Sequence, residues 1–110
     1  MEAIAKLSFV RLSPQKARLV IDMVRGKAVQ EALHILKFSP QKSAEIVAKL
    51  VRSALANAEQ KGVGDVDRLF VKTIFVDQGP VLRRFMPKGR GSASRIRKPT
   101  SHITVVLGEQ

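Results

Sequence analysis

Residues 78–108 contain seven basic residues and no aspartate or glutamate, in a chain of 110 residues with 20 Lys and Arg against 9 Asp and Glu. The seven cations are Arg83, Arg84, Lys88, Arg90, Arg95, Arg97 and Lys98. A segment without acids offers its cations no partner within itself. It is either a solvated surface or a surface that contacts a polyanion. We favour the polyanion, because the seven charges are concentrated on a segment that we expect to protrude.

Strand patterns flank this basic segment. Residues 69–76 alternate with period two and are rich in β-branched and aromatic types, and a matching strand is expected at 102–107. Between them, residues 89–92 have the composition of a tight turn. We therefore predict a β-hairpin over about residues 79–100 with its tip at 89–92. Pairing about that tip places Val76 opposite Ile103 and Pro80 near Pro99, and the arms beyond the prolines project roughly 30 Å.

The rest of the chain predicts a first strand followed by three helices. Residues 3–12 alternate with period two, with Leu7 and Phe9 expected to face the core. The helices begin near residues 14, 28 and 41 and end near 26, 37 and 61, and Ser13-Pro14 is typical of a helix start. The residues expected on the buried helix faces follow helical spacing: Ala17, Val20, Ile21, Val24, Val29, Ala32, Leu33, Leu36, Ala44, Val47, Ala48, Val51, Ala54, Leu55 and Ala58.

The sequence contains no pattern typical of a catalytic, metal or cofactor site. The two histidines, His34 and His102, have no ligand spacing, and Asp65 and Asp67 lack the other oxygen ligands of a calcium loop. The chain has no cysteine, which excludes disulfides, thiolate metal sites and cysteine nucleophiles. We therefore expect no enzymatic activity, no catalytic residue, no metal and no cofactor.

The composition also bears on location and on the number of domains. The charges of Glu2, Lys6 and Arg11 within the first twelve residues are unlike a signal peptide, and no apolar run is long enough to span a bilayer. The length suits one domain with its own core. We expect a single domain over residues 1–110 and a soluble, intracellular protein with no membrane partner.

Four motifs in order along the chain resemble the bacterial large-subunit ribosomal protein L twenty-two family. The resemblance covers essentially the whole sequence. The motifs are Ser13-Pro14-Gln15-Lys16-Ala17-Arg18-Leu19-Val20 with Arg25-Gly26-Lys27, then Ser53-Ala54-Leu55-Ala56-Asn57-Ala58-Glu59, then Val76-Asp77-Gln78-Gly79-Pro80, and Arg95-Ile96-Arg97-Lys98 leading to Thr100-Ser101-His102-Ile103-Thr104-Val105. The resemblance implies an α+β fold, with three helices packed on a small antiparallel sheet and a long protruding basic β-hairpin.

The resemblance also implies a function and a set of contact residues. It implies a structural constituent of the large ribosomal subunit that binds large-subunit rRNA, supports early subunit assembly and places its hairpin along the wall of the polypeptide exit tunnel. The implied RNA-binding residues are Ser13, Lys16, Arg18, Arg25, Lys27, Asn57, Arg83, Arg84, Lys88, Arg90, Arg95, Arg97, Lys98, Thr100, Ser101 and His102. The implied tunnel-side residues are Arg83, Arg84, Met86, Lys88, Gly89, Arg90, Gly91 and Ser92.

The same resemblance implies partners and a location, and it has two departures. The partners are large-subunit rRNA, neighbouring large-subunit proteins and the nascent polypeptide, for a monomer within cytoplasmic ribosomes. The family has an arginine where Ser92 stands and a basic residue where Pro99 stands. The first departure removes a cation at the tip, and the second leaves the strand pairing at the hairpin base open.

Two other classes of protein remain as alternatives. One is an architectural DNA-binding protein with a basic β-ribbon arm, in which Pro87 acts as a wedge near the tip. Such proteins are usually dimers and leave a long apolar helix face uncovered, whereas the alanine-rich third helix and the sheet are expected to cover each other. The other is an enzyme, which requires a pocket that the sequence does not reveal.

Overall fold

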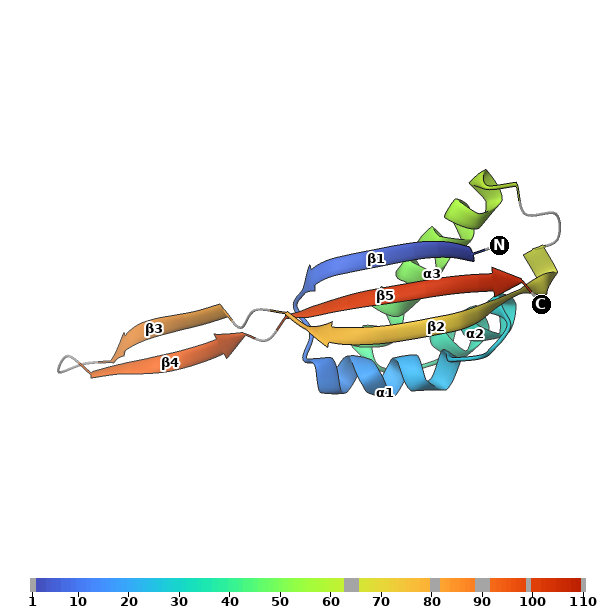
Figure 1. Ribbon diagram of the computed structural model, residues 1–110. Coiled ribbons are helices and arrows are strands. Elements are labelled where there is room, and N and C mark those ends of the chain that lie inside the picture. Colours follow the sequence, from blue (N-terminus) through green and yellow to red (C-terminus); the bar gives the residue numbers. More distant parts are fainter. Residues whose placement is uncertain (1, 63–65, 80–81, 89–91, 99, 110) are drawn as a thin grey trace.

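The structure is a computed structural model of residues 1–110, and it describes residues 2–62, 66–79, 82–88, 92–98 and 100–109. Side chains are described for 2–62, 66–79 and 100–109. The elements, in chain order, are β1 (Glu2–Val10), α1 (Pro14–Val24), α2 (Val29–Lys37), α3 (Lys42–Gln60), a 3-10 turn (Val66–Arg68), β2 (Leu69–Gln78), β3 (Leu82–Lys88), β4 (Ser92–Lys98) and β5 (Ser101–Glu109) (Figure 1).

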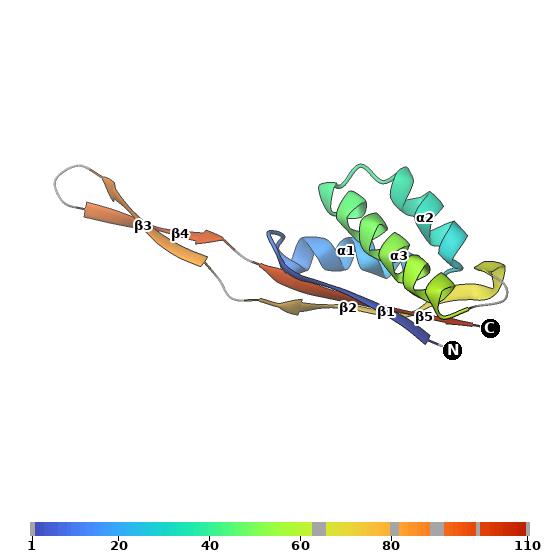
Figure 2. The same ribbon diagram turned by 90° about the horizontal axis from the view of Figure 1, so that it is seen from above.

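The body of the molecule is a three-stranded antiparallel sheet with three helices on one of its faces. The strand order is β1-β5-β2, so the last strand of the chain is central. Figure 2 shows α1, α2 and α3 together on one side of this sheet, and no helix of the described residues lies on the other side. The predicted α+β fold is therefore confirmed, and so is the predicted pairing of Val76 with Ile103.

A separate two-stranded antiparallel sheet, β3 with β4, extends the β2 and β5 arms away from the body (Figure 1). The molecule measures 65 × 26 × 16 Å, and its radius of gyration of 17.2 Å exceeds the value of about 13 Å expected for a compact chain of this length. The protruding hairpin is thus confirmed. The predicted tip residues Gly89, Arg90 and Gly91 and the predicted Pro80–Pro99 proximity lie outside the described residues.

The helices form where capping groups and apolar spacing coincide. Ser13 caps α1, because its side-chain oxygen accepts a hydrogen bond from the Lys16 backbone N–H at 3.3 Å, and Pro14 follows at the first helical position. After α1, Gly26 has a φ of +80°, a left-handed conformation that suits glycine at a helix end. The predicted stop at Gly26 is confirmed.

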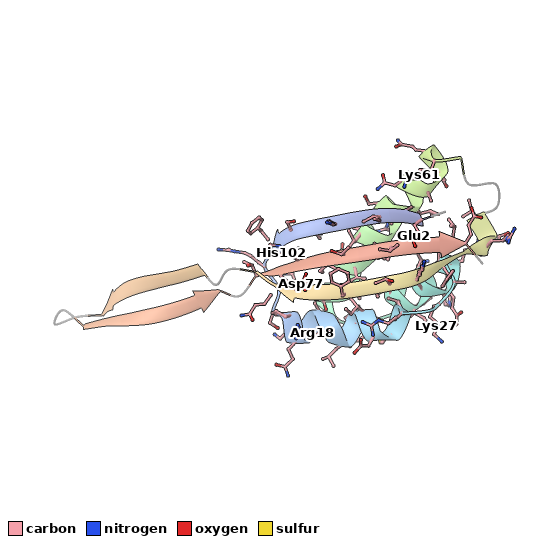
Figure 3. All side chains as sticks on the ribbon, viewed as in Figure 1. Glu2, Arg18, Lys27, Lys61, Asp77 and His102 are labelled. Carbon is pink, nitrogen blue, oxygen red and sulfur yellow. The ribbon has the colours of Figure 1, made fainter. Side chains whose placement is uncertain are left out.

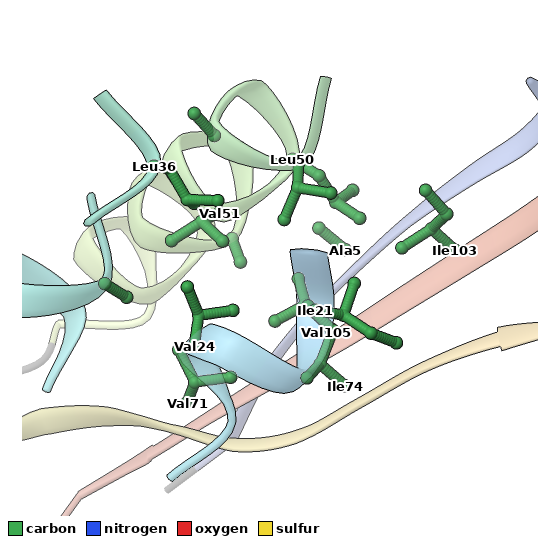
Figure 4. Packing of buried hydrophobic residues seen from close by; sticks show 14 of the residues in the cluster. Ala5, Ile21, Val24, Leu36, Leu50, Val51, Val71, Ile74, Ile103 and Val105 are labelled. Carbon is green, nitrogen blue, oxygen red and sulfur yellow. The ribbon is translucent and has the colours of Figure 1, made fainter. Parts of the chain in front are cut away.

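The core lies between the helices and the covered face of the sheet (Figure 4). The residues predicted on the buried helix faces are all buried or partly buried; Leu33 and Leu55 are only partly buried. Alanines 44, 48, 54 and 58 of α3 are buried, which lets this helix approach the sheet closely. The sheet contributes Val71, Ile74, Ile103, Val105 and Leu107.

The prediction that Phe9 faces the core is wrong. Ala3 and Ala5 are buried and Leu7 is partly buried, as the alternation of β1 requires, but the Phe9 side chain is 65% exposed. The cause is a break in the strand register between Leu7 and Val10, where Phe9 adopts a φ of +58°. An irregularity of this kind reverses which face the following residues occupy.

Gly79, at the body end of the hairpin, has no room for a side chain. A Cβ there would lie 2.5 Å from Thr100 Oγ1 and 3.3 Å from the Thr100 carbonyl carbon. We expect Gly79→Ala to destabilise the body by about 1–3 kcal/mol, seen as a lower melting temperature, because the two strands must move apart. Thr100→Ala in the same chain should restore part of that loss. An unchanged melting temperature for Gly79→Ala would show that the strands are not in close contact here.

Candidate nucleic-acid interface

Basic positions of the hairpin lie on both faces of the β3–β4 ribbon. Opposite positions share a face, and faces alternate along a strand. The register pairs Arg83 with Arg97, so these two positions share a face with Arg95, which pairs with Phe85. The positions of Arg84, Lys88 and Lys98 share the other face. Each face of the ribbon therefore carries three basic positions, and one of the pairs sets two arginines opposite each other.

A pair of like charges at opposite positions destabilises an isolated ribbon. A polyanion that neutralises the arginines removes this repulsion, so the sequence of the hairpin favours a bound polyanion over water alone. Because the basic positions occupy both faces, a polyanion can contact the ribbon from both sides.

Two arginines of the α1 region bind to the edge of β2. The Arg25 guanidinium donates a hydrogen bond to the Ile74 carbonyl at 2.9 Å and also pairs with Asp22 at 2.7 Å. Arg18 donates to the Val76 carbonyl at 3.4 Å. Both side chains are exposed, so each one both fastens α1 to the sheet and presents positive charge.

Lys27 lies beside β2, because its carbonyl accepts a hydrogen bond from the Val71 backbone N–H at 2.8 Å, whereas Lys16 lies about 200° around α1 from Arg18. Both lysines are exposed, Lys16 within α1 and Lys27 just after it. Figure 3 shows Arg18 and Lys27 toward opposite ends of α1. The implied contact residues Arg18, Arg25 and Lys27 therefore form a basic strip along the α1–β2 edge, and Lys16 lies on another side of α1.

Other implied RNA-binding residues hold the body together. Ser101 is fully buried, and its hydroxyl donates to the Leu12 carbonyl at 2.7 Å. Thr100 is also buried and lies against Gly79. The Asn57 side-chain amide donates to the Ile4 carbonyl at 3.0 Å, which attaches α3 to the outer edge of β1. The side chains of Thr100 and Ser101 are therefore covered by the body itself.

The implied body residues do not form one patch. The basic strip follows the α1–β2 edge, whereas Asn57 lies at the opposite edge of the sheet, on the β1 side. His102 lies on the central strand at the end nearest the hairpin (Figure 3). The structure therefore brings the residues of the basic strip together but separates them from Asn57.

Sequence reasoning missed Phe9. Its backbone N–H donates to His102 Nδ1 at 3.1 Å, and its ring meets the His102 ring edge-on at 4.8 Å between centroids. A left-handed conformation costs a non-glycine residue about 1–3 kcal/mol. An exposed aromatic ring held in this way points to a functional role. The sequence carries no signal for it, because the alternation of β1 predicts a buried Phe9.

The end of the sheet remote from the hairpin carries a balanced pair of charges. Glu2 on β1 forms an ion pair with Lys72 on β2, across the backbone of Gly108. The hydrogen bond and the positive charge of Lys72 lower the pKa of Glu2 below its usual value of 4.5.

The described residues contain neither a metal-binding cluster nor a membrane-spanning helix. No three His, Cys, Asp or Glu side chains in the described part of the chain are grouped to hold a metal ion. No helix there is long and apolar enough to cross a membrane.

A small α+β body that bears a strongly basic β-hairpin is typical of proteins that bind nucleic acid. The family model described as ribosomal protein L22p/L17e matches residues 5–108, and the chain belongs to this family. It is 74% identical over 110 residues to large ribosomal subunit protein uL22 of Syntrophotalea carbinolica, with both chains fully covered.

Two further relatives carry the same name. The uL22 protein of Geobacter metallireducens is 71% identical to this chain over 110 residues, which cover 100% of both proteins. The uL22 protein of Geobacter sulfurreducens is 70% identical over 110 residues, which cover 100% of this chain and 99% of the relative. Proteins of this family are structural, so the prediction that the chain is not an enzyme is confirmed. The expected cytoplasmic, ribosomal location is confirmed by the same membership.

Proposed function

We propose that this protein is a structural component of the large ribosomal subunit that binds large-subunit rRNA through its hairpin and the basic strip of α1. The observation that carries the proposal is the placement of basic residues on both faces of a ribbon that has no acid. Phosphates neutralise arginine and lysine without any need for a particular sequence. The relatives are named as proteins of the large ribosomal subunit, which supports rRNA as the polyanion.

The proposal gives the two parts of the molecule different tasks. The hairpin inserts between segments of rRNA, and its outer part, with Arg83, Arg84, Met86, Lys88 and residues 89–92, lines the polypeptide exit tunnel. The body lies against rRNA along the α1–β2 edge and supports early assembly of the subunit. The 65 Å length of the molecule supports this division, because it separates the hairpin from the body. Neighbouring large-subunit proteins and the nascent polypeptide are the other proposed partners of a monomeric chain.

We expect rRNA binding to weaken steeply with salt. If all seven hairpin cations contact phosphates, the hairpin should contribute roughly 5–6 to the slope with which the logarithm of the binding constant falls against the logarithm of the salt concentration, and contacts of the basic strip add to this slope. Filter binding of the full chain to large-subunit rRNA between low and moderate salt measures this slope.

Matched double variants locate the contacts. Arg83→Gln with Arg97→Gln removes one register pair of the hairpin and should reduce the slope by about 1.5. Lys61→Gln with Lys72→Gln removes the same charge from the end of the body remote from the hairpin, where both lysines bond to Glu2, and should leave the slope nearly unchanged. A flat salt response, or equal affinity for duplex DNA of the same length, would count against the proposal.

A further inference from the structure

We propose that Phe9 and the groove beside it bind one unstacked nucleotide of the rRNA, with the base stacked on the Phe9 ring and its phosphate held by Lys6 and Lys49. This inference rests on the proposed function and adds to it a contact that involves a base as well as backbone phosphate.

The Phe9 ring is exposed and fixed in place. Its exposed fraction is 65%, and the left-handed backbone of Phe9 turns the side chain away from the core. His102 holds Phe9 at two points, because its Nδ1 accepts the Phe9 backbone N–H and its imidazole packs edge-on against the Phe9 ring. A rigid exposed aromatic ring is the usual platform for an unstacked base.

A groove of about 440 Å³ lies beside this ring, between β1 and α3. That volume falls within the usual range for small-ligand sites of roughly 300–1,000 Å³. Leu7, Ile46 and Leu50 provide an apolar lining, and Phe9 contributes to it. Lys6 and Lys49 are its charged residues, both exposed, and no residue that lines it is acidic.

The composition of the groove favours RNA over a protein segment. Lysine is depleted at the centre of protein–protein interfaces, whereas lysine beside an aromatic ring suits a phosphate and its base. The location of the groove also favours RNA, because His102, which contacts Phe9, lies at the end of β5 from which the hairpin extends (Figure 3). An rRNA strand that contacts the hairpin base therefore passes within reach of Phe9.

The chain contains no tryptophan and no tyrosine, so one introduced tryptophan reports on one place. Phe9→Trp puts that reporter in the groove, and Phe38→Trp is the matched control, because Phe38 is similarly exposed, at 69%, and does not line the groove. Each full-length variant is titrated with large-subunit rRNA alone. We expect base stacking to quench the indole fluorescence of the Phe9→Trp variant, whereas that of the Phe38→Trp variant should change much less.

Affinity gives a second readout. Phe9→Leu removes the ring but no charge, so it should weaken rRNA binding about tenfold while the salt slope stays the same. Phe9→Tyr should bind as the unaltered chain does. Lys6→Gln with Lys49→Gln should instead lower the slope, by about 0.7, because the two lysines hold one phosphate.

Three results would overturn the inference without touching the proposed function. They are unquenched fluorescence of the Phe9→Trp variant while rRNA still binds, undiminished affinity for Phe9→Leu, and a fluorescence response of Phe9→Trp that requires other large-subunit proteins. The last result would assign the groove to a protein segment. If the unaltered chain fails to bind rRNA at all, the proposed function fails first.

Discussion

Val51→Asp is expected to abolish the folded state of the body. Val51 has no exposed surface and lies on the face of α3 that packs into the core, in the same buried cluster as Val24 and Leu36 (Figure 4). A buried, unpaired carboxylate costs several kcal/mol, which is comparable to the whole stability of a small domain, about 5–15 kcal/mol. Circular dichroism during heating should show no cooperative melting transition.

Ala56→Asp is the control for this substitution. Ala56 lies on the same helix but is exposed, so its aspartate stays in water and lowers the helix propensity by about 0.7 kcal/mol. This variant should melt cooperatively, close to the melting temperature of the unaltered chain. A soluble Val51→Asp variant that also melts cooperatively would contradict the assigned face of α3.

Removing the hairpin is expected to separate stability from RNA binding. Replacement of residues 82–98 by a short Gly-Ser linker removes all seven basic residues of the hairpin. The β3–β4 sheet is separate from the β1-β5-β2 sheet, and the described core residues all lie in the body. The melting temperature should therefore change by only a few degrees, while the affinity for large-subunit rRNA falls by roughly three orders of magnitude at moderate salt.

A full-length variant with the seven hairpin cations changed to glutamine separates charge from shape. It should lose nearly as much affinity as the deletion, because phosphate contacts supply most of the binding. Near-normal affinity in the glutamine variant would show that shape dominates instead. A large fall in melting temperature on deletion would show that the hairpin supports the core.

Much of the fold follows from local patterns. Ser13-Pro14 and Gly26 mark the two ends of α1, and helical spacing identifies the buried residues of α3. Pairing the strands about the turn composition at 89–92 predicts that Val76 lies opposite Ile103, as it does. Each of these patterns involves residues that are near one another along the chain or are arranged about one turn, so it can be recognised in a single sequence. The confirmed fold class rests on their agreement.

Phe9 shows where such patterns fail. The alternation of β1 predicts a buried ring, but the register break and the hydrogen bond to His102 reverse that outcome. His102 is 93 residues away along the chain. No local pattern carries information about a partner at that distance, so the exposed ring and the groove beside it become visible only in three dimensions.

The candidate nucleic-acid interface also has one part that the sequence predicts and one part that it does not. The charge of the hairpin can be counted in the sequence, because it depends on composition alone. The roles of Ser101 and Asn57 cannot, since their bonds to Leu12 and Ile4 depend on how distant elements pack. The separation of Asn57 from the basic strip of α1 likewise follows from the strand order β1-β5-β2, which no single segment specifies.

The most direct test of the central claim is where the chain sediments. A tagged copy is expressed in bacterial cells, and the lysate is passed through a sucrose gradient after a high-salt wash that removes loosely bound basic proteins from RNA. We predict that the tagged full-length chain migrates with the large subunit and that a tagged chain without the hairpin does not. A tag that stays at the top of the gradient, or that follows chromosomal DNA, would contradict the assignment to the large ribosomal subunit.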